Sequence, residues 1–304
     1  MKFRIVLTGA CAGALVLTGC GAGGGAKPAS AGQPEAVAAV RAATATTVDA
    51  GSSRTRTTMT MTSGDRTVTL TGQGLFDYRR RVGTVSLDVP KDSGLTGPLQ
   101  EVVTPEALYM KNATPGVPAD KWVRIEVRGL ADGNLISGGS ADPTTSFEIL
   151  RGVNDDVVLA GTEKLGADDV RKYTGTLDIR KAHDLSPENQ RAPLAAALKS
   201  FASPTIPFEV LLDAQGRLRK VQEEFNLASG GSGGKAERTA KVVSAAELYD
   251  FGVPVQVQPP RPDELYVADG AATPPAGAPA SPAAPASPSA SGSASPTASP
   301  TRKR

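Results

Sequence analysis

The chain has 304 residues, of which 39% are hydrophobic and 4% aromatic, with 33 Lys and Arg against 31 Asp and Glu. This length and apolar content are sufficient for one large domain or two small ones. The near-neutral charge excludes a strongly basic surface, so we expect no nucleic-acid partner. Cys11 and Cys20 are the only cysteines, so the chain beyond Cys20 must be stabilised by its core and not by disulfides.

The first predicted element is an export signal at residues 1–19. Two cations, Lys2 and Arg4, precede an apolar run from residue 5 to 17 that is too short to cross a bilayer. Leu-Thr-Gly then leads into Cys20, which predicts cleavage before that cysteine. The pattern resembles a bacterial lipobox, and the resemblance implies that a lipid on Cys20 anchors the chain to the cell membrane, outside the cytoplasm. An ordinary secreted protein with an accidental cysteine is the alternative.

Residues 20–34 are rich in Gly and Ala and are expected to form a flexible tether after the lipidated cysteine. Apolar residues then recur at helical spacing, which predicts a helix over 34–48. After Gly51 the period changes to two, with Thr55, Thr57, Met59 and Met61 on one face of a first strand.

Most of the remaining chain up to residue 258 shows short alternating runs separated by Gly, Pro and Asp turns, as in an antiparallel sheet. Strands are predicted at 66–78, 82–89, 99–103, 107–111, 121–127, 157–164, 170–179, 205–212, 217–227 and 235–243. Helices are predicted at 143–153 and from residue 186 through Leu194 and Leu198, with a single turn at 245–249. The fold class is therefore α+β, with a large antiparallel sheet and about three helices.

The last segment, residues 259–304, is predicted to be a disordered tail. Beyond Asp269 it contains only Ala, Pro, Ser, Thr and Gly until Arg302, and such a segment has no apolar surface to bury. Its Ser and Thr residues beside prolines fit either O-glycosylation or a bare spacer.

The sequence does not predict an enzyme, a metal site or a cofactor. Gly230–Gly234 matches the nucleophile-elbow pattern around Ser232, but the only histidine, His183, lies upstream of it. Three acidic pairs remain. Adjacent strand residues point to opposite faces, so the two members of a pair cannot easily share one metal ion, and the pairs are expected at turns and on the surface. They are Asp155-Asp156, Asp168-Asp169 and Glu223-Glu224.

The lipobox, the first helix, the Thr-rich first strands and four later motifs together resemble the LppX/LprAFG family of bacterial envelope lipoproteins, and the resemblance covers residues 35–258. The four later motifs are Trp-Val-Arg-Ile at 122–125, Val-Leu-Ala-Gly-Thr-Glu at 158–163, Val-Arg-Lys-Tyr-Thr-Gly-Thr-Leu-Asp at 170–178 and Pro-Phe-Glu-Val-Leu-Leu-Asp-Ala-Gln-Gly-Arg-Leu at 207–218. The resemblance implies a half-open barrel related to LolA/LolB-type carriers, with helices on its concave side lining an apolar cavity for the acyl chains of lipids or lipoglycans. The family has no catalytic residues.

We expect one apolar face of the early strands to meet a helix across this ligand cavity. The candidate cavity residues are Val68, Leu70, Phe76, Val85, Leu87, Phe147 and Leu150. Ordinary core packing produces the same alternation. The alternative is therefore a non-enzymatic interaction or scaffold lipoprotein, whose sheet is fully packed and whose tail or sheet edge binds an envelope protein.

Overall fold

The computed structural model describes residues 33–90, 97–113, 116–127, 130, 135–136, 142–227 and 240–267. The predicted export signal, Cys20, Ser232 and the chain beyond residue 267 lie outside the described residues. No helix in the described ranges is long and apolar enough to cross a membrane.

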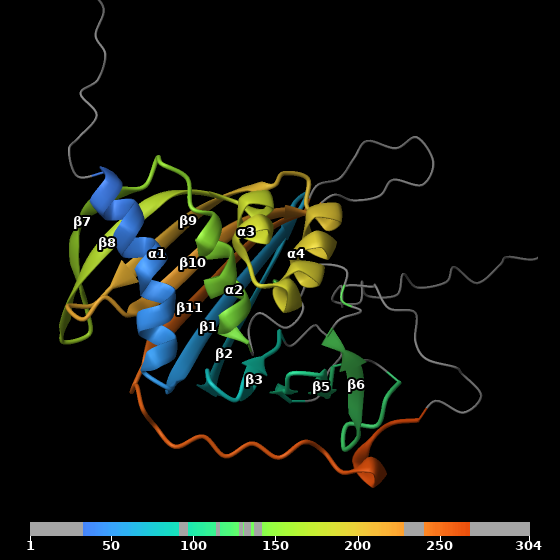
Figure 1. Cartoon of the computed structure of the whole chain (residues 1–304). Helices are drawn as coiled ribbons and strands as arrows, with labels where there is room; N and C mark the ends of the chain where they lie inside the picture. Colours follow the sequence, from blue (N-terminus) through green and yellow to red (C-terminus); the bar gives the residue numbers. More distant parts are fainter. Residues whose placement is uncertain are drawn as a thin grey trace, which may run out of the picture. The chain divides into compact units, whose positions relative to one another are not determined.

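Eleven strands of the described chain form one antiparallel sheet that does not close (Figure 1). They are β1 (Ser52–Ser63), β2 (Arg66–Asp77), β3 (Val82–Asp88), β4 (Leu99–Val103), β5 (Ala107–Lys111), β6 (Trp122–Glu126), β7 (Val158–Leu165), β8 (Asp168–Asp178), β9 (Thr205–Leu212), β10 (Leu218–Leu227) and β11 (Ala240–Tyr249). Their order is β6-β5-β4-β3-β2-β1-β11-β10-β9-β8-β7, so the first and last strands pair in the middle. The predicted α+β class with a large antiparallel sheet is confirmed.

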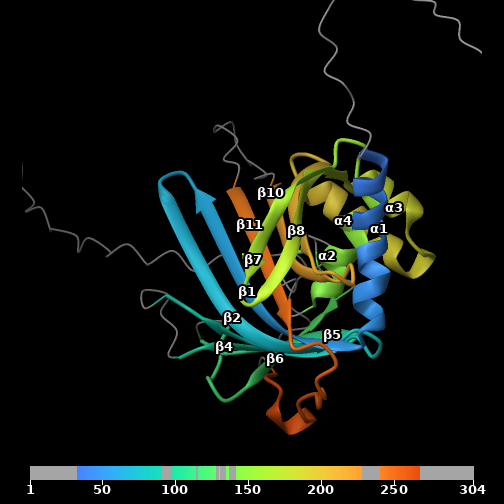
Figure 2. The same ribbon diagram turned by 90° about the vertical axis from the view of Figure 1, so that its left-hand side faces the viewer.

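Four α-helices of the described chain cover one face of this sheet, which we call the inner face (Figures 1 and 2). They are α1 (Gln33–Asp49), α2 (Pro143–Ile149), α3 (Ile179–Leu185) and α4 (Glu188–Ser200), and the short 3-10 helix η3 (Leu150–Gly152) continues α2. Side chains of α1 and α2 share a single hydrophobic core with the inward side chains of the strands.

Helix α3 was not predicted. The Asp178 carboxylate accepts a hydrogen bond from the backbone N–H of Arg180 at 2.7 Å, which ends β8 and caps the helix. His183 therefore lies in α3. Pro193 lies in the second turn of α4 and does not end that helix.

The single turn expected at 245–249 is also wrong, because these residues form the second half of β11. Their backbone pairs with β1 on one side, from Arg54 opposite Tyr249, and with β10 on the other. Two neighbouring ladders hold this Ala-rich stretch extended, although its local sequence favours a turn.

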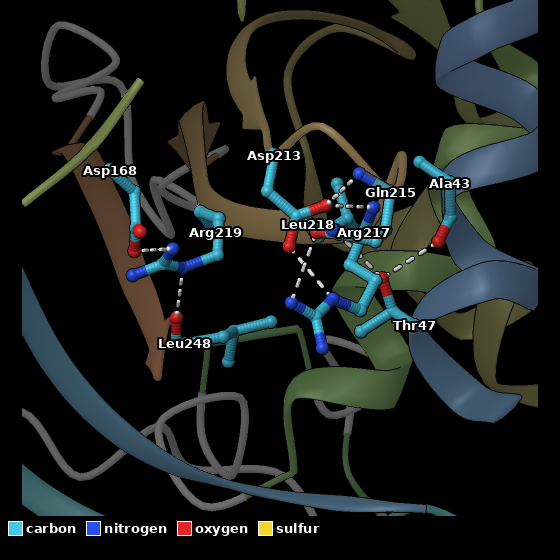
Figure 3. Close-up of polar contacts among 9 residues, drawn as sticks. All are labelled: Ala43, Thr47, Asp168, Asp213, Gln215, Arg217, Leu218, Arg219 and Leu248. Atoms are coloured by element: carbon cyan, nitrogen blue, oxygen red, sulfur yellow. Dashed lines mark hydrogen bonds and ion pairs between the residues drawn. The ribbon is translucent and has the colours of Figure 1, made fainter. Parts of the chain in front are cut away.

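Polar contacts fix the end of α1 and the turn between β9 and β10 (Figure 3). The buried Asp213 carboxylate accepts hydrogen bonds from the backbone N–H of Gln215 and of Arg217, and Nε of Arg217 donates to it at 2.7 Å. On α1, the Thr47 hydroxyl donates to the Ala43 carbonyl at 2.7 Å and accepts from the backbone N–H of Leu218 at 2.8 Å. The helix is thus hydrogen-bonded to the first residue of β10.

The segment after β11 returns to the other end of the sheet, where β6 forms the edge (Figure 1). It contains a short 3-10 helix, η4 (Pro262–Glu264). The backbone N–H of Tyr266 donates to the Trp122 carbonyl at 2.8 Å, and Nζ of Lys121 donates to the Asp263 carbonyl at 2.8 Å. Residues 262–266 therefore pack on β6 and do not belong to the disordered tail expected from residue 259.

Candidate functional site

The strand register decides which side chains reach the inner face. Thr55, Thr57, Met59 and Met61 share one face of β1, as predicted, and they lie opposite even-numbered residues of β2 from Gly74 to Val68. On β3, Val85 and Leu87 lie opposite Gly74 and Gly72. Because laterally paired residues point to the same side of a sheet, all these residues belong to the inner face.

The seven candidate cavity residues fall into two groups. Five of them are buried in one core cluster, and the other two, nearer the β1–β2 turn, are half-buried. The buried group is Phe76, Val85, Leu87, Phe147 and Leu150, and the half-buried pair is Val68 and Leu70. The structure thus brings the strand face and the helix together, while a ligand cavity at these residues stays a prediction.

Tyr78 lies where β2 and α2 meet. Its ring centroid is 5.7 Å from that of Phe76 and 5.8 Å from that of Phe147. Burial raises the pKa of the Tyr78 phenol, while a 2.6 Å hydrogen bond with the Ser53 hydroxyl lowers it. The strand face and the helix therefore pack directly at this end. Tyr78 was not among the predicted cavity residues, although the alternation through Phe76 places it on the same face.

The middle of the inner face carries small side chains, which the sequence reading did not identify as a feature. Gly72 lies opposite Thr57, and Thr57 lies opposite Ala246 of β11. We call the set on these three adjacent strands the small-residue stripe, and it consists of Thr55, Thr57, Gly72, Gly74, Ser244 and Ala246. A Cβ atom at Gly72 would lie 2.5 Å from Cδ2 of Leu87 and 2.7 Å from the Ser86 carbonyl oxygen, so Leu87 and the β3 backbone already fill the space beside this glycine.

Large apolar side chains border the small-residue stripe on both sides. Val85 and Leu87 extend the face on β3, and Val221 and Phe225 extend it on β10. Large side chains also lie among the small ones on the central strands, because Leu248 lies opposite Thr55 and Met59 lies opposite Ser244.

Glu223 of β10 is a buried acid within this apolar border. It lies opposite Ser244 of β11 and Phe208 of β9, and 2% of its surface is exposed. Its Oε2 accepts a 2.9 Å hydrogen bond from the Ser146 hydroxyl of α2, whereas Oε1 has no hydrogen-bond partner within the described chain. Burial raises the pKa of Glu223 to about 8, and the Ser146 hydrogen bond opposes this only in part. The carboxyl group is therefore mostly protonated at neutral pH.

The surface position expected for the pair Glu223-Glu224 is thus wrong for its first member. Glu224 does lie on the outer face, where it forms a 2.8 Å ion pair with Lys241. The alternation of Val221, Glu223 and Phe225 was the signal that places Glu223 inside.

The other polar candidates do not assemble into a catalytic or metal site in the described chain. His183 contacts only its neighbour Asp184 among the charged groups, at 3.0 Å on the surface of α3. Asp156 accepts hydrogen bonds from the backbone and hydroxyl of Thr176. No cluster of three potential metal ligands occurs among the described residues.

A depression of about 370 Å³ lies mainly on the outer face, although Gly74 of the small-residue stripe and Val85 also line it. Outward-facing residues such as Gln73, Ser86 and Gln100 line it, together with Tyr249 and Trp122. No helix residue contributes to its lining, so it is separate from the junction of α2 and the sheet.

Comparisons with known proteins find structural likeness only. No family model and no curated protein matches the chain. LprF from Mycobacterium bovis is 13% identical, with 75% of this chain and 97% of that chain covered and a TM-score of 0.41. LppX from Mycobacterium tuberculosis is 14% identical, with 74% and 99% covered and a TM-score of 0.42.

A putative outer membrane lipoprotein-sorting protein domain from Vibrio parahaemolyticus is 13% identical, with 74% of this chain and 95% of that chain covered and a TM-score of 0.31.

Proposed function

We propose that this protein is an envelope lipoprotein that binds the acyl chains of a lipid or lipoglycan on the inner face of its sheet. It acts as a carrier or chaperone between the membrane and the outer envelope, and it is not an enzyme. The observation that supports this proposal is the small-residue stripe, which lies in the centre of an apolar sheet face beneath helices.

The physical reason is the volume that small side chains leave. Threonine, serine and alanine occupy inner-face positions that leucine or phenylalanine would fill in a fully packed core. An acyl chain between α2 and the stripe would replace the missing side-chain atoms, and each buried methylene group contributes about 0.8 kcal/mol. Such binding needs no cofactor and no catalytic residue.

The alternative is an interaction or scaffold lipoprotein with a filled sheet. The direct ring contacts of Tyr78 with Phe76 and Phe147 favour it, because at that end the layers touch. The two functions differ in what they require at the small-residue stripe, so the stripe is the place to test them.

The test compares Ala246→Phe with Ala245→Phe, a matched control on the next residue. Ala246 is half-buried on the inner face, and Ala245 points to the outer face. We expect Ala246→Phe to lose most of the lipid that co-purifies per mole of protein, measured by native mass spectrometry, with little change in the denaturant midpoint. Ala245→Phe should retain the lipid.

The opposite outcome supports the scaffold function. If the stripe is already filled, the wild-type protein carries no lipid, and Ala246→Phe lowers the free energy of unfolding by about 1–3 kcal/mol through overpacking.

The attachment of the protein to the membrane is a separate part of the proposal. We propose that Cys20 carries the lipid anchor, since the export signal ends there. Cys20→Ser protein should appear in the soluble fraction or remain uncleaved. Processed Cys20→Ser protein that still needs detergent for extraction contradicts the anchor.

A further inference from the structure

Glu223 is a buried hydrogen-bonding group that the fold satisfies only in part. The Ser146 hydroxyl donates to Oε2, so Oε2 acts as the acceptor oxygen of the carboxyl group. In a neutral carboxylic acid the other oxygen then carries the proton. This O–H group on Oε1 is a donor without an acceptor in the described chain. A buried polar group without a partner is costly, and it is rare in folded proteins.

The position of Glu223 relates this donor to the small-residue stripe. Ser244, a member of the stripe, lies directly opposite Glu223 on β11. Opposite pairs on one sheet face have Cβ atoms about 4.5–5.5 Å apart. The carboxyl group is therefore at the border of the region in which an acyl chain is proposed to lie.

We propose that Glu223 is a specificity-determining residue of the lipid site, and that its O–H group donates a hydrogen bond to the carbonyl oxygen that joins an acyl chain to its headgroup. The ligand class is thus an acyl ester or amide, as opposed to a hydrocarbon or an ether lipid. This inference rests on the proposed lipid-binding function and adds to it a residue and a functional group of the ligand.

The surroundings of Glu223 favour an uncharged acceptor. Its inward neighbours are Phe208, Val221, Phe225, Ser244 and, from α2, Ser146, none of which is charged. The acidic and basic residues of the same elements are engaged elsewhere. Glu209 pairs with Lys172 and Lys220, Glu224 pairs with Lys241, Glu247 pairs with Arg56, and Glu148 of α2 pairs with Arg151.

Two consequences follow from this environment. A phosphate would meet no cation there, and an ammonium group would meet a neutral acid in place of a carboxylate. A carbonyl oxygen needs only the one donor that Oε1 supplies.

The experiment uses two glycerol lipids with the same chain, a 1-oleoyl ester and a 1-O-oleyl ether, titrated against the full-length protein. The wild type should bind the ester about tenfold more tightly than the ether, which is the effect of one buried hydrogen bond. Glu223→Leu should bind both lipids equally, at the affinity of the wild type for the ether. Glu223→Gln keeps an N–H donor and should keep the preference.

A pH series gives a second measurement that does not depend on the folding of the leucine variant. The wild-type preference for the ester should disappear between about pH 7 and pH 10 as the carboxyl group loses its proton, while that of Glu223→Gln stays constant. If the wild type does not prefer the ester, or if its preference does not change with pH, the proposed role of Glu223 is overturned. A wild type that binds both lipids equally well leaves the lipid-binding function in place, whereas binding of neither lipid contradicts that function as well.

Discussion

The carboxyl group of Glu223 is buried beneath α2, and one hydrogen-bond donor, the Ser146 hydroxyl, contacts it. Its pKa is raised to about 8 in the folded protein, compared with about 4.3 in an unfolded chain. The folded state therefore keeps a proton that the unfolded state releases between these two pH values. The stability that this proton contributes is complete below about pH 4, decreases as the pH rises and is lost above about pH 8.

We predict that Glu223→Gln removes this pH dependence. The wild type should lose up to about 1.4 kcal/mol of unfolding free energy per pH unit within the window, and the glutamine variant should not. The stability advantage of Glu223→Gln over wild type should thus grow from pH 5 to pH 8, measured by denaturant unfolding at constant salt.

Glu224→Gln is the matched control, because Glu224 lies next in sequence and forms an ion pair with Lys241 on the outer face. Its unfolding free energy should differ little from that of the wild type at every pH. Parallel pH profiles for wild type and Glu223→Gln would show that the carboxyl group is not buried as described.

Among the elements, α1 and the β9–β10 hairpin are connected through one hydroxyl group. Thr47 accepts from the backbone N–H of Leu218, which is buried and is the first residue of β10 (Figure 3). We predict that Thr47→Val lowers the free energy of unfolding by about 1–3 kcal/mol, because the Leu218 N–H is left without an acceptor.

Thr46→Val is the control for that prediction. Thr46 makes the same hydrogen bond to the carbonyl four residues earlier, at Ala42, but on the exposed side of the helix. Its replacement should change the unfolding free energy by less than about 0.5 kcal/mol. Equal losses for the two variants would mean that the contact with β10 adds nothing.

Elements with strong local periodicity were predictable from the sequence. The strands β1, β2 and β3 follow the alternation of residues 54–89 closely, and α1 follows its helical spacing. Two segments were not predictable in this way. The structure of residues 245–249 depends on distant strand partners, and that of residues 179–185 depends on one helix cap. Arg54 of β1 supplies the ladder partner of Tyr249, and Asp178 starts α3.

The parts of the candidate site that follow local alternation were predictable, and the parts that depend on strand register were not. Alternation placed Phe76 and Val85 on one face, and burial agrees with this. The small-residue stripe depends on the register between Thr57 and Ala246, which no local pattern contains. Glu223 was expected on the surface together with Glu224, although its neighbours in the alternation, Val221 and Phe225, are apolar.

On the scale of the whole molecule, the last described residues connect the middle of the sheet to its edge. Residues 250–266 run from the end of β11 to β6, where Tyr266 and Asp263 are hydrogen-bonded to Trp122 and Lys121. We predict that truncation after Gln258 lowers the melting temperature by a few degrees, because these contacts are lost. Truncation after Asp269 should leave the melting temperature unchanged, since the removed residues 270–304 have no apolar surface to bury.

Thermal unfolding of the two truncated proteins and of the full-length chain tests this prediction. A loss of several degrees on truncation after Asp269 would show that the Ala- and Pro-rich residues also bind the body. Identical melting temperatures for all three proteins would show that the pairing with β6 contributes nothing.

The pairing of β1 with β11 sets the time at which this protein can fold. Arg54 pairs with Tyr249, so about two hundred further residues must be synthesised before the two central strands can pair. At about 5–20 residues per second, this synthesis takes on the order of 10–40 s. During that time β1 has an open edge that can pair wrongly with another chain. Until β11 is made, the half of the sheet from β1 to β6 and the half from β7 to β10 have no strand that joins them.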